Sequence, residues 1–333
     1  MKRIRNLLLA LAVALSAAAC DAFRTLNGSS LKTSQGAPYE LLVVCEQRVW
    51  NGEAGDTLRA VLTEPVAYLN QTEPKFDVLR VRAQDFTGML ASHRNILKVH
   101  IDPSLDKAAT GVEYDVTAAP QIVLTLQGPD EKSIAEYIST YRSEIVAVLE
   151  AAERKRALAF AEKFGAPTVE KAIERTFGVE MNVPKGYILA TDEKDFLWAR
   201  YEYPTASQGF FLYSYPYEGP AAMSAEALTR TRNRFAARIP GPSDGSYMTT
   251  SDVFPPDYRM FYLEGRLWFE LRGFWDVEGD FMGGPFVSYT TIDTQTDRVF
   301  TLDCYVYSPK LHKRNFVRGV EHLLYGVKFP QEK

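Results

Sequence analysis

The sequence predicts two domains, an N-terminal α/β layer and a C-terminal α+β domain whose antiparallel sheet is covered by helices, joined by a long helix. Three observations support this fold class. The chain has 333 residues, 46% hydrophobic and 24% charged, which is enough for two domains of about 150 residues. Strand and helix patterns alternate as far as residue 128, and a continuous helical pattern fills residues 129–164. After that helix, short aromatic-rich strands follow one another.

Residues 1–19 have the order of a secretory signal peptide. Lys2, Arg3 and Arg5 precede an apolar segment at residues 7–15, and small residues follow it. The apolar segment is too short to span a bilayer, which takes about 20 residues. We therefore expect this part to be removed on export.

The end of that segment points to a lipid anchor. Ala17-Ala18-Ala19-Cys20 resembles the lipobox of bacterial lipoproteins, and the resemblance implies that Cys20 carries acyl chains such as palmitate. Several acyl chains hold a protein on a membrane more firmly than one chain does. Residues 20–37, polar and rich in Gly and Ser, would then be a lipidated tether. The alternative is plain secretory cleavage with an unmodified Cys20.

Charge restricts the partners and the location. The net charge of −4 argues against nucleic acid, which calls for a basic surface. No segment after Cys20 is apolar enough to be a transmembrane helix, so the lipid would be the contact with the membrane. No acidic run suggesting surface export follows Cys20, and we expect the protein on the periplasmic side of the outer membrane.

Two further cysteines, Cys45 and Cys304, lie in strand-like text of different domains. An exported protein can oxidise such a pair, but a disulfide requires the two strands to approach closely. We expect both thiols to be buried and reduced.

The first domain, residues 38–165, reads as alternating strands and helices. Continuous apolar runs predict buried strands, and period-two alternation predicts a further strand. The expected strands are 38–45, 75–83, 94–102 and 120–128, with helices at 56–66 and 85–93. The long helix at 129–164 closes the domain, and Gly165-Ala166-Pro167 ends it.

The second domain, residues 166–330, opens with a helix at 168–178 and continues mainly as strands. Ser224 is the expected N-cap of a helix at 224–239, and Glu264-Gly265 the turn of a hairpin. The other strands are expected within 183–204, 209–219, 285–293 and 298–309, and a closing helix at 313–329. Antiparallel strands with helices on one side form an α+β domain. This order also resembles a PsbP-like sandwich by pattern, which implies no activity.

Known catalytic motifs are absent from the sequence. None of the four histidines lies in a catalytic phrase, and no GxSxG, HExxH, Walker, CxxC or dinucleotide motif occurs. We therefore expect no catalytic residue, no metal site and no cofactor.

The most unusual phrase is "WDVEGDFMGGPF". Its three acids raise the question of calcium, but their spacing is not that of an EF-hand loop. A second interpretation is a hairpin whose glycines supply positive φ angles. The third, which we prefer to test, is an exposed recognition tip, because thioether and aromatic groups suit binding surfaces. The candidate tip residues are Trp275, Phe281, Met282, Gly283, Gly284, Pro285 and Phe286.

Two other patterns leave alternatives open. Arg230, Arg234 and Arg238 follow one side of a helix, where they either gather an anion or form a solvated face. Aromatic residues alternate along one strand, where they either stack on a sugar or pack in the core. These aromatic residues are Phe211, Tyr213, Tyr215 and Tyr217.

Four phrases together resemble one family. "APYELLVVCEQRVW", "APQIVLTLQGPDE", "IPGPSDGSYM" and "GDFMGGPFVSY" are similar, in this order, to Bacteroidota lipoproteins of the family called domain of unknown function 4837. The resemblance implies an envelope lipoprotein and transfers no catalytic residue. We expect a membrane-anchored accessory protein that binds an envelope protein or complex. The alternative is a glycan-binding protein or enzyme with its site between the two domains.

Overall fold

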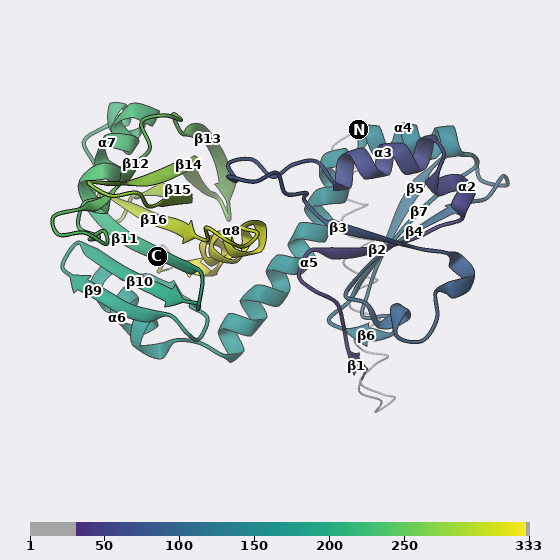
Figure 1. Ribbon diagram of the computed structural model, residues 1–333, viewed down its shortest axis with the longest axis horizontal. Coiled ribbons are helices and arrows are strands. Elements are labelled where there is room, and N and C mark those ends of the chain that lie inside the picture. Colours follow the sequence, from purple (N-terminus) through teal and green to yellow (C-terminus); the bar gives the residue numbers. More distant parts are fainter. Residues whose placement is uncertain (1–30, 331–333) are drawn as a thin grey trace.

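A computed structural model describes residues 31–330. The predicted signal peptide, Cys20 and the first part of the tether lie outside the described residues, so the lipid anchor stays a prediction. Figure 1 shows two domains side by side along the longest axis, with one long helix running from the first to the second. Within the described residues, no helix is long and apolar enough to cross a membrane.

The first domain is built on a five-stranded sheet with strand order β3-β2-β4-β7-β5. Four strands are parallel and β5 is an antiparallel edge strand. The strands are β2 (Glu40–Val44), β3 (Asp77–Val81), β4 (Asn95–Ile101), β5 (Ala109–Tyr114) and β7 (Ile122–Gly128). Three helices pack on one face, as the apolar runs of parallel strands require: α3 (Glu53–Leu62), α4 (Glu131–Thr140) and α5 (Arg142–Lys163). Smaller elements are β1 (Lys32–Thr33), α2 (Gln47–Trp50) and β6 (Ala118–Ala119).

Two helix predictions in this domain are wrong in detail. Residues 85–93 form no helix, because Gly88 at φ +57 separates two single turns, η1 (Ala83–Asp85) and η2 (Leu90–Ser92). The long helix is broken at Tyr141, which ends α4 and precedes α5. The break lets α4 follow α3 and β7 while α5 leaves toward the second domain.

The second domain is built on an eight-stranded antiparallel sheet with strand order β12-β14-β15-β16-β11-β10-β9, and β13 also pairs with β14. Glu264 at φ 52 and Gly265 at φ 80 turn the predicted hairpin, since a two-residue turn of type I′ requires positive φ at both positions. The strands are β9 (Ile188–Glu193), β10 (Phe196–Glu202), β11 (Ser207–Pro216), β12 (Tyr247–Thr250), β13 (Asp257–Leu263), β14 (Arg266–Glu278), β15 (Gly283–Asp293) and β16 (Arg298–Tyr307).

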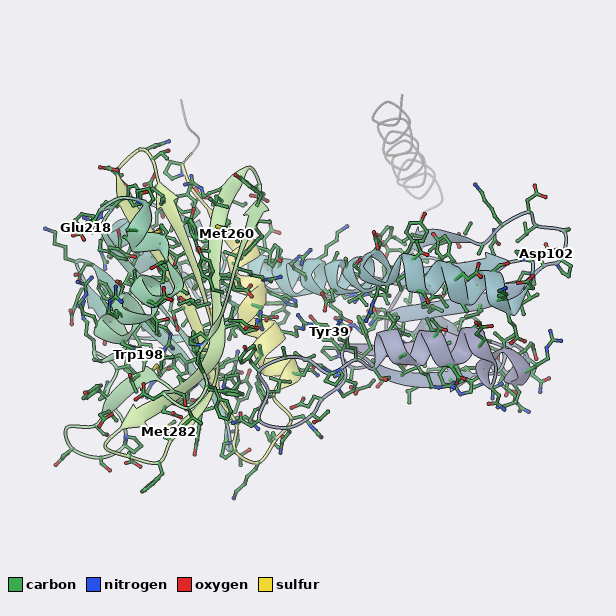
Figure 2. The ribbon with its side chains drawn as sticks, turned by 90° about the horizontal axis from the view of Figure 1, so that it is seen from above. Tyr39, Asp102, Trp198, Glu218, Met260 and Met282 are labelled. Carbon is green, nitrogen blue, oxygen red and sulfur yellow. The ribbon has the colours of Figure 1, made fainter. Side chains whose placement is uncertain are left out.

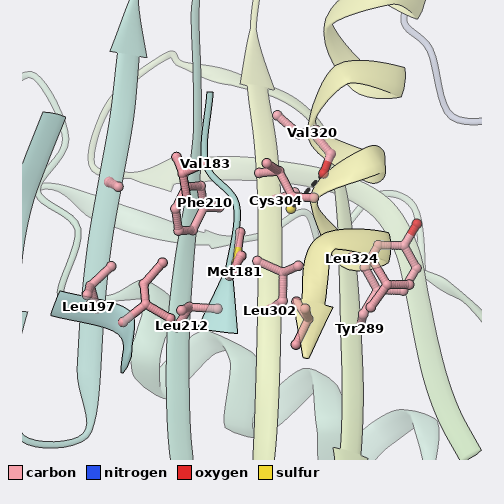
Figure 3. Packing of buried hydrophobic residues seen from close by; sticks show 14 of the residues in the cluster. Met181, Val183, Leu197, Phe210, Leu212, Tyr289, Leu302, Cys304, Val320 and Leu324 are labelled. Carbon is pink, nitrogen blue, oxygen red and sulfur yellow. Dashed lines mark hydrogen bonds between the residues drawn. The ribbon is translucent and has the colours of Figure 1, made fainter. Parts of the chain in front are cut away.

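Helices cover both faces of this sheet, not one face as the sequence predicts. The α7 helix (Ala225–Ala236) lies on one face, and α6 (Pro167–Phe177) and α8 (Arg314–Glu321) lie on the other. The central strands require this because they are apolar on both faces: Phe210 and Leu212 belong to one core, Phe211 and Tyr213 to the opposite one. Figure 3 shows the core on the α8 side. The α/β plus α+β fold class is confirmed.

The ends of the helices follow local chemistry. Ser224 caps α7 as predicted, accepting from the backbone N–H of Ala227 at 3.3 Å. The expected closing helix is shorter: α8 passes into a 3₁₀ turn, η4 (His322–Gly326), and a short strand, β17 (Val327–Lys328), that pairs with β8 (Glu180–Met181). A further 3₁₀ turn, η3 (Pro220–Met223), precedes α7.

Ion pairs and a helix cap join the two domains. The carboxylate of Glu73, from a loop of the first domain, accepts from the backbone N–H groups of Lys313 at 2.6 Å and Arg314 at 2.9 Å, where α8 begins. The guanidinium of Arg318 on α8 contacts Glu150 of α5 at 2.6 Å. The α8 helix is therefore held by both domains.

Cys45 and Cys304 are both buried and free, as expected. Burial raises the pKa of both thiols. The Cys304 thiol donates to the backbone carbonyl of Val320 at 3.4 Å, drawn as a dashed line in Figure 3. Neither residue is therefore placed as a reactive thiolate.

Candidate binding groove

A groove of about 540 Å³ lies in the second domain on the α7 side of the sheet. Its walls come from β10, β14 and β16, and its rim from the segments around residues 204–206 and 240–242. Figure 2 labels Trp198 and Met282 on this domain. The volume falls within the range of about 300–1,000 Å³ that is usual for ligand sites.

One wall is formed by alternate residues of β10. Trp198, Arg200 and Glu202 share one face of the strand because strand side chains alternate. The Arg200 guanidinium lies over the Trp198 ring, 5.3 Å from its centroid, and its Nη1 is 3.4 Å from the Glu202 carboxylate. The wall is therefore an aromatic surface with a charged rim.

Tyr305 of β16 forms the floor beside this wall. Its hydroxyl accepts from the indole N–H of Trp198 at 2.8 Å, across the intervening strand β11. The strand position between them is Gly209, which pairs with both Arg200 and Tyr305. Burial raises the pKa of Tyr305, so its hydroxyl keeps its proton.

Trp275 of β14 extends the floor. Its ring meets Tyr305 edge-on at 5.7 Å between centroids, and its indole N–H donates to the carbonyl of Val306 at 3.2 Å. Gly284 makes this approach possible, because a Cβ there would lie 2.1 Å from the same carbonyl oxygen. The absence of a side chain at Gly284 therefore helps to form the floor of the groove.

Two loops meet at one end of the groove. The hydroxyl of Ser243 donates to the carboxylate of Asp280, and this hydrogen bond lowers the pKa of the Asp280 carboxyl. The same carboxylate accepts from the backbone N–H of Phe281 at 2.6 Å. These loops are the phrases "IPGPSDGSYM" and "GDFMGGPF". Asp280 is thus engaged by its own loops, and residues 31–330 hold no group of three His, Cys, Asp or Glu side chains placed for a metal.

The structure divides the predicted tip into two parts. Phe281 is fully exposed at the turn between β14 and β15, and Met282 is half-buried in the groove wall. Trp275 and Phe286 are buried, at 1% and 2% exposure, and support the turn from below. Gly283, Gly284 and Pro285 belong to β15. Phe281 thus projects from the turn, and Trp275 and Met282 line the groove.

Sequence reasoning missed Trp198, Arg200, Tyr305 and Tyr307 as groove residues. The available signal was period-two alternation in "FLWARYEYP" and "LDCYVYSP", which sets these side chains on one face of each strand. How much of that face is accessible depends on how far α7 extends over the sheet. The local sequence of the strands does not contain this information.

The structure decides between the interpretations of the aromatic residues along β11 and of the three aligned arginines. Tyr213 is buried and stacks on Phe235 of α7 at 4.3 Å, so core packing is the correct interpretation there. Arg230 and Arg234 are exposed, whereas Arg238 pairs with Glu193 and Asp195. The three arginines therefore do not converge on an anion.

Two other hollows are each lined by a single domain. A larger one of about 1,140 Å³ is lined by residues of the second domain, including Trp268 and Phe329. A third, of about 460 Å³, is lined by residues 48–132 of the first domain. Where the domains meet, Glu73 caps α8 and the Arg318 guanidinium pairs with Glu150.

Family models divide the chain where the two domains meet. Residues 166–326 match Domain of unknown function (DUF4837), and residues 34–161 match a second model, Domain of unknown function (DUF8532). The second domain is therefore similar to the DUF4837 family. The DUF8532 match precedes it and contains the first two of the four phrases, so the predicted resemblance to DUF4837 is confirmed for residues 166–326. No curated protein matches.

Three solved structures show weak similarity to this chain. LpqN of Mycobacterium tuberculosis, described as involved in cell envelope biogenesis, is 12% identical over 45% of this chain and 83% of its own, with a TM-score of 0.27. A Bacteroides thetaiotaomicron protein is 12% identical over 46% of each chain, with a TM-score of 0.20. The lipid transfer and protein localization domain of human StarD13 is 11% identical over 48% and 94%, at 0.22.

Proposed function

We propose that this protein is a lipid-anchored accessory protein of the bacterial envelope that binds another envelope protein and catalyses no reaction. The observation that carries the proposal is the continuity of the groove with the exposed Phe281–Met282 turn. Met282 belongs to both, since it lines the groove and follows Phe281 directly. Aromatic and Met side chains are enriched at protein interfaces.

The groove favours binding over catalysis. Its lining contains no His, Cys or Asp, and its one acidic residue, Glu202, is paired with Arg200. A catalytic site needs an acid, a base or a nucleophile in mutual reach. The lining instead supplies apolar surface from Trp198, Met248 and Met282.

Anchoring belongs to the same proposal. Acylated Cys20 and a tether that ends before Lys32, where β1 pairs with β6, would hold the body close to the membrane and leave it free to turn; the predicted tether of residues 20–37 is thus too long at its C-terminal end. We place it on the periplasmic side of the outer membrane of a Bacteroidota cell. Intact-mass analysis of the native protein tests this directly, and an unmodified thiol or a mature start elsewhere would remove the anchor.

Site-specific photo-crosslinking in native envelopes tests the binding function. A photoreactive residue at position 281 should capture one protein, and the Met282→Ser change should reduce that capture. Met260, which is 59% exposed on the edge strand β13, is the matched control position and should capture nothing. Equal capture at both positions, or none at 281, would contradict the proposal.

A further inference from the structure

We infer that the groove takes an extended peptide segment in which an acidic residue stands beside an apolar anchor. This inference rests on the proposed function and specifies the chemistry of the partner. Three features of the groove carry it: more cationic than acidic side chains, an apolar wall and a row of hydroxyl groups.

The cationic donors are Arg200 and Lys310, which face a single acidic lining residue, Glu202. The Arg200 side chain is 42% exposed, so its guanidinium is accessible from the groove. Its contact with Glu202 at 3.4 Å is long for a hydrogen bond. Lys310 forms no ion pair with the described part of the chain. A guanidinium that lies beside an aromatic ring and is partly exposed can bind a carboxylate through its Nη groups.

The apolar wall lies next to these donors. Trp198 lies below the Arg200 guanidinium, and Met248 and Met282 come from the opposite side of the groove, on β12 and the β14–β15 turn. Unbranched thioether side chains adapt to different apolar partners. A Leu, Ile, Phe or Tyr side chain placed here would lie close enough for its neighbouring carboxylate to reach Arg200.

The hydroxyl groups favour a peptide over an acyl chain. Tyr203, Thr205, Ser207 and Tyr307 line the groove, and none of these hydroxyls has a hydrogen-bond partner within residues 31–330. An acyl chain would cover these groups and leave them unpaired, which is unfavourable. The amide groups of an extended peptide would pair with them. Burial raises the pKa of Tyr203 to about 12, so it remains a donor at neutral pH.

A peptide selection tests this inference. The full chain, reconstituted in lipid nanodiscs, is used to select from a phage library of random dodecapeptides. We expect enrichment of sequences with Asp or Glu within two positions of a large apolar residue. The best peptide should bind the Arg200→Gln, Lys310→Gln double variant at least about tenfold more weakly, a loss of the size that one charge-assisted contact gives. Its Asp→Asn or Glu→Gln version should lose a similar factor against the wild type.

Arg230→Gln is the matched control, because Arg230 is an exposed arginine of the same domain outside the groove. It should leave peptide affinity unchanged. The inference is overturned if no acidic pattern is enriched, if the amide peptide binds as tightly, or if sodium palmitate displaces the peptide and binds the wild type more tightly. If it fails while capture at position 281 still depends on Met282, the proposed function stands without this ligand class.

Discussion

The ring of Tyr305 occupies the space that a side chain at Gly209 would fill. A Cβ at Gly209 would lie 2.5 Å from both Cζ and the hydroxyl oxygen of Tyr305. The absence of a side chain lets the ring lie over β11 and reach Trp198. One glycine in the centre of a sheet therefore sets the floor of the groove.

Gly209→Ala should displace the Tyr305 ring and break its hydrogen bond with Trp198. The expected cost is about 1–3 kcal/mol in the free energy of unfolding, as for other overpacked cores. Urea unfolding followed by tryptophan fluorescence measures it. Gly111→Ala is the control, since Gly111 also lies in a strand and a Cβ there meets nothing within 4 Å. Equal stability of the two variants would show that the close approach is not needed.

Arg232 and Asp303 form an ion pair with no exposed side-chain surface. The guanidinium donates to both carboxylate oxygens, at 2.8 and 3.2 Å, and lies 3.6 Å from the ring centroid of Phe286. Arg232→Met leaves Asp303 buried and unpaired, which should cost about 3–5 kcal/mol. Arg230→Gln on the exposed side of α7 should change stability by less than about 0.5 kcal/mol. Chemical denaturation compares the two, and a small effect of Arg232→Met would mean that water reaches Asp303.

Local signals in the sequence were sufficient for most of the elements and insufficient for the groove. Glu264-Gly265 and Ser224 act through their own neighbours, and both were predicted correctly. The break at Tyr141 has no such signal, because neither glycine nor proline stands there. It depends on where α4 and α5 pack.

The groove depends on contacts between distant residues. Ser243 and Asp280 lie in two phrases that stand out in the sequence. The hydrogen bond between these two residues exists only because β12 pairs with β14. Trp198 and Tyr305 likewise meet only because β11 inserts between β10 and β16. Alternation along a strand predicts which residues share a face and cannot predict which part of that face a helix leaves open.

Removing the Glu73 carboxylate should loosen α8 from the first domain. Glu73→Ala deletes the acceptor for two backbone N–H groups at the start of that helix. Leaving them unpaired should cost about 1–3 kcal/mol. Hydrogen exchange should accelerate at the amides of Lys313 and Arg314. Glu136→Ala, which removes only an exposed pair with Lys132, should have little effect. Unchanged exchange at both amides would refute the capping role.

Acid should weaken the domain junction through His322. Burial lowers the pKa of His322 from 6.5 to about 4, and its Nε2 is 3.1 Å from the Tyr39 hydroxyl. The unfolded chain therefore binds a proton that the folded chain excludes, so this residue reduces stability progressively as the pH falls from 6.5 to 4. Burial alone would raise the pKa of Glu321, but Arg272 and Arg318 lower it to about 2. The stability that this carboxylate contributes is therefore lost only as the pH falls below 4.5.

His322→Gln should consequently flatten the pH dependence of unfolding between pH 6.5 and 4, removing a loss of up to about 3 kcal/mol. Denaturation midpoints measured at pH 7, 5.5 and 4.5 provide the slope. His100→Gln, on an exposed strand position, is the control and should keep the wild-type slope. A steep slope in His322→Gln would place the acid sensitivity in another group.

Phe281 and Phe286, five residues apart in the same phrase, should respond in opposite ways to truncation. Phe281 is fully exposed, so Phe281→Ser should change the free energy of unfolding by less than about 0.5 kcal/mol. It should also reduce the capture of the partner by a photoreactive residue placed at position 282. Phe286 is buried against the Arg232 guanidinium, so Phe286→Ala should cost about 3–5 kcal/mol. Any loss of binding in Phe286→Ala then reports a damaged fold. Undiminished capture by a stably folded Phe281→Ser protein would exclude the tip as a contact and leave the groove alone to be tested.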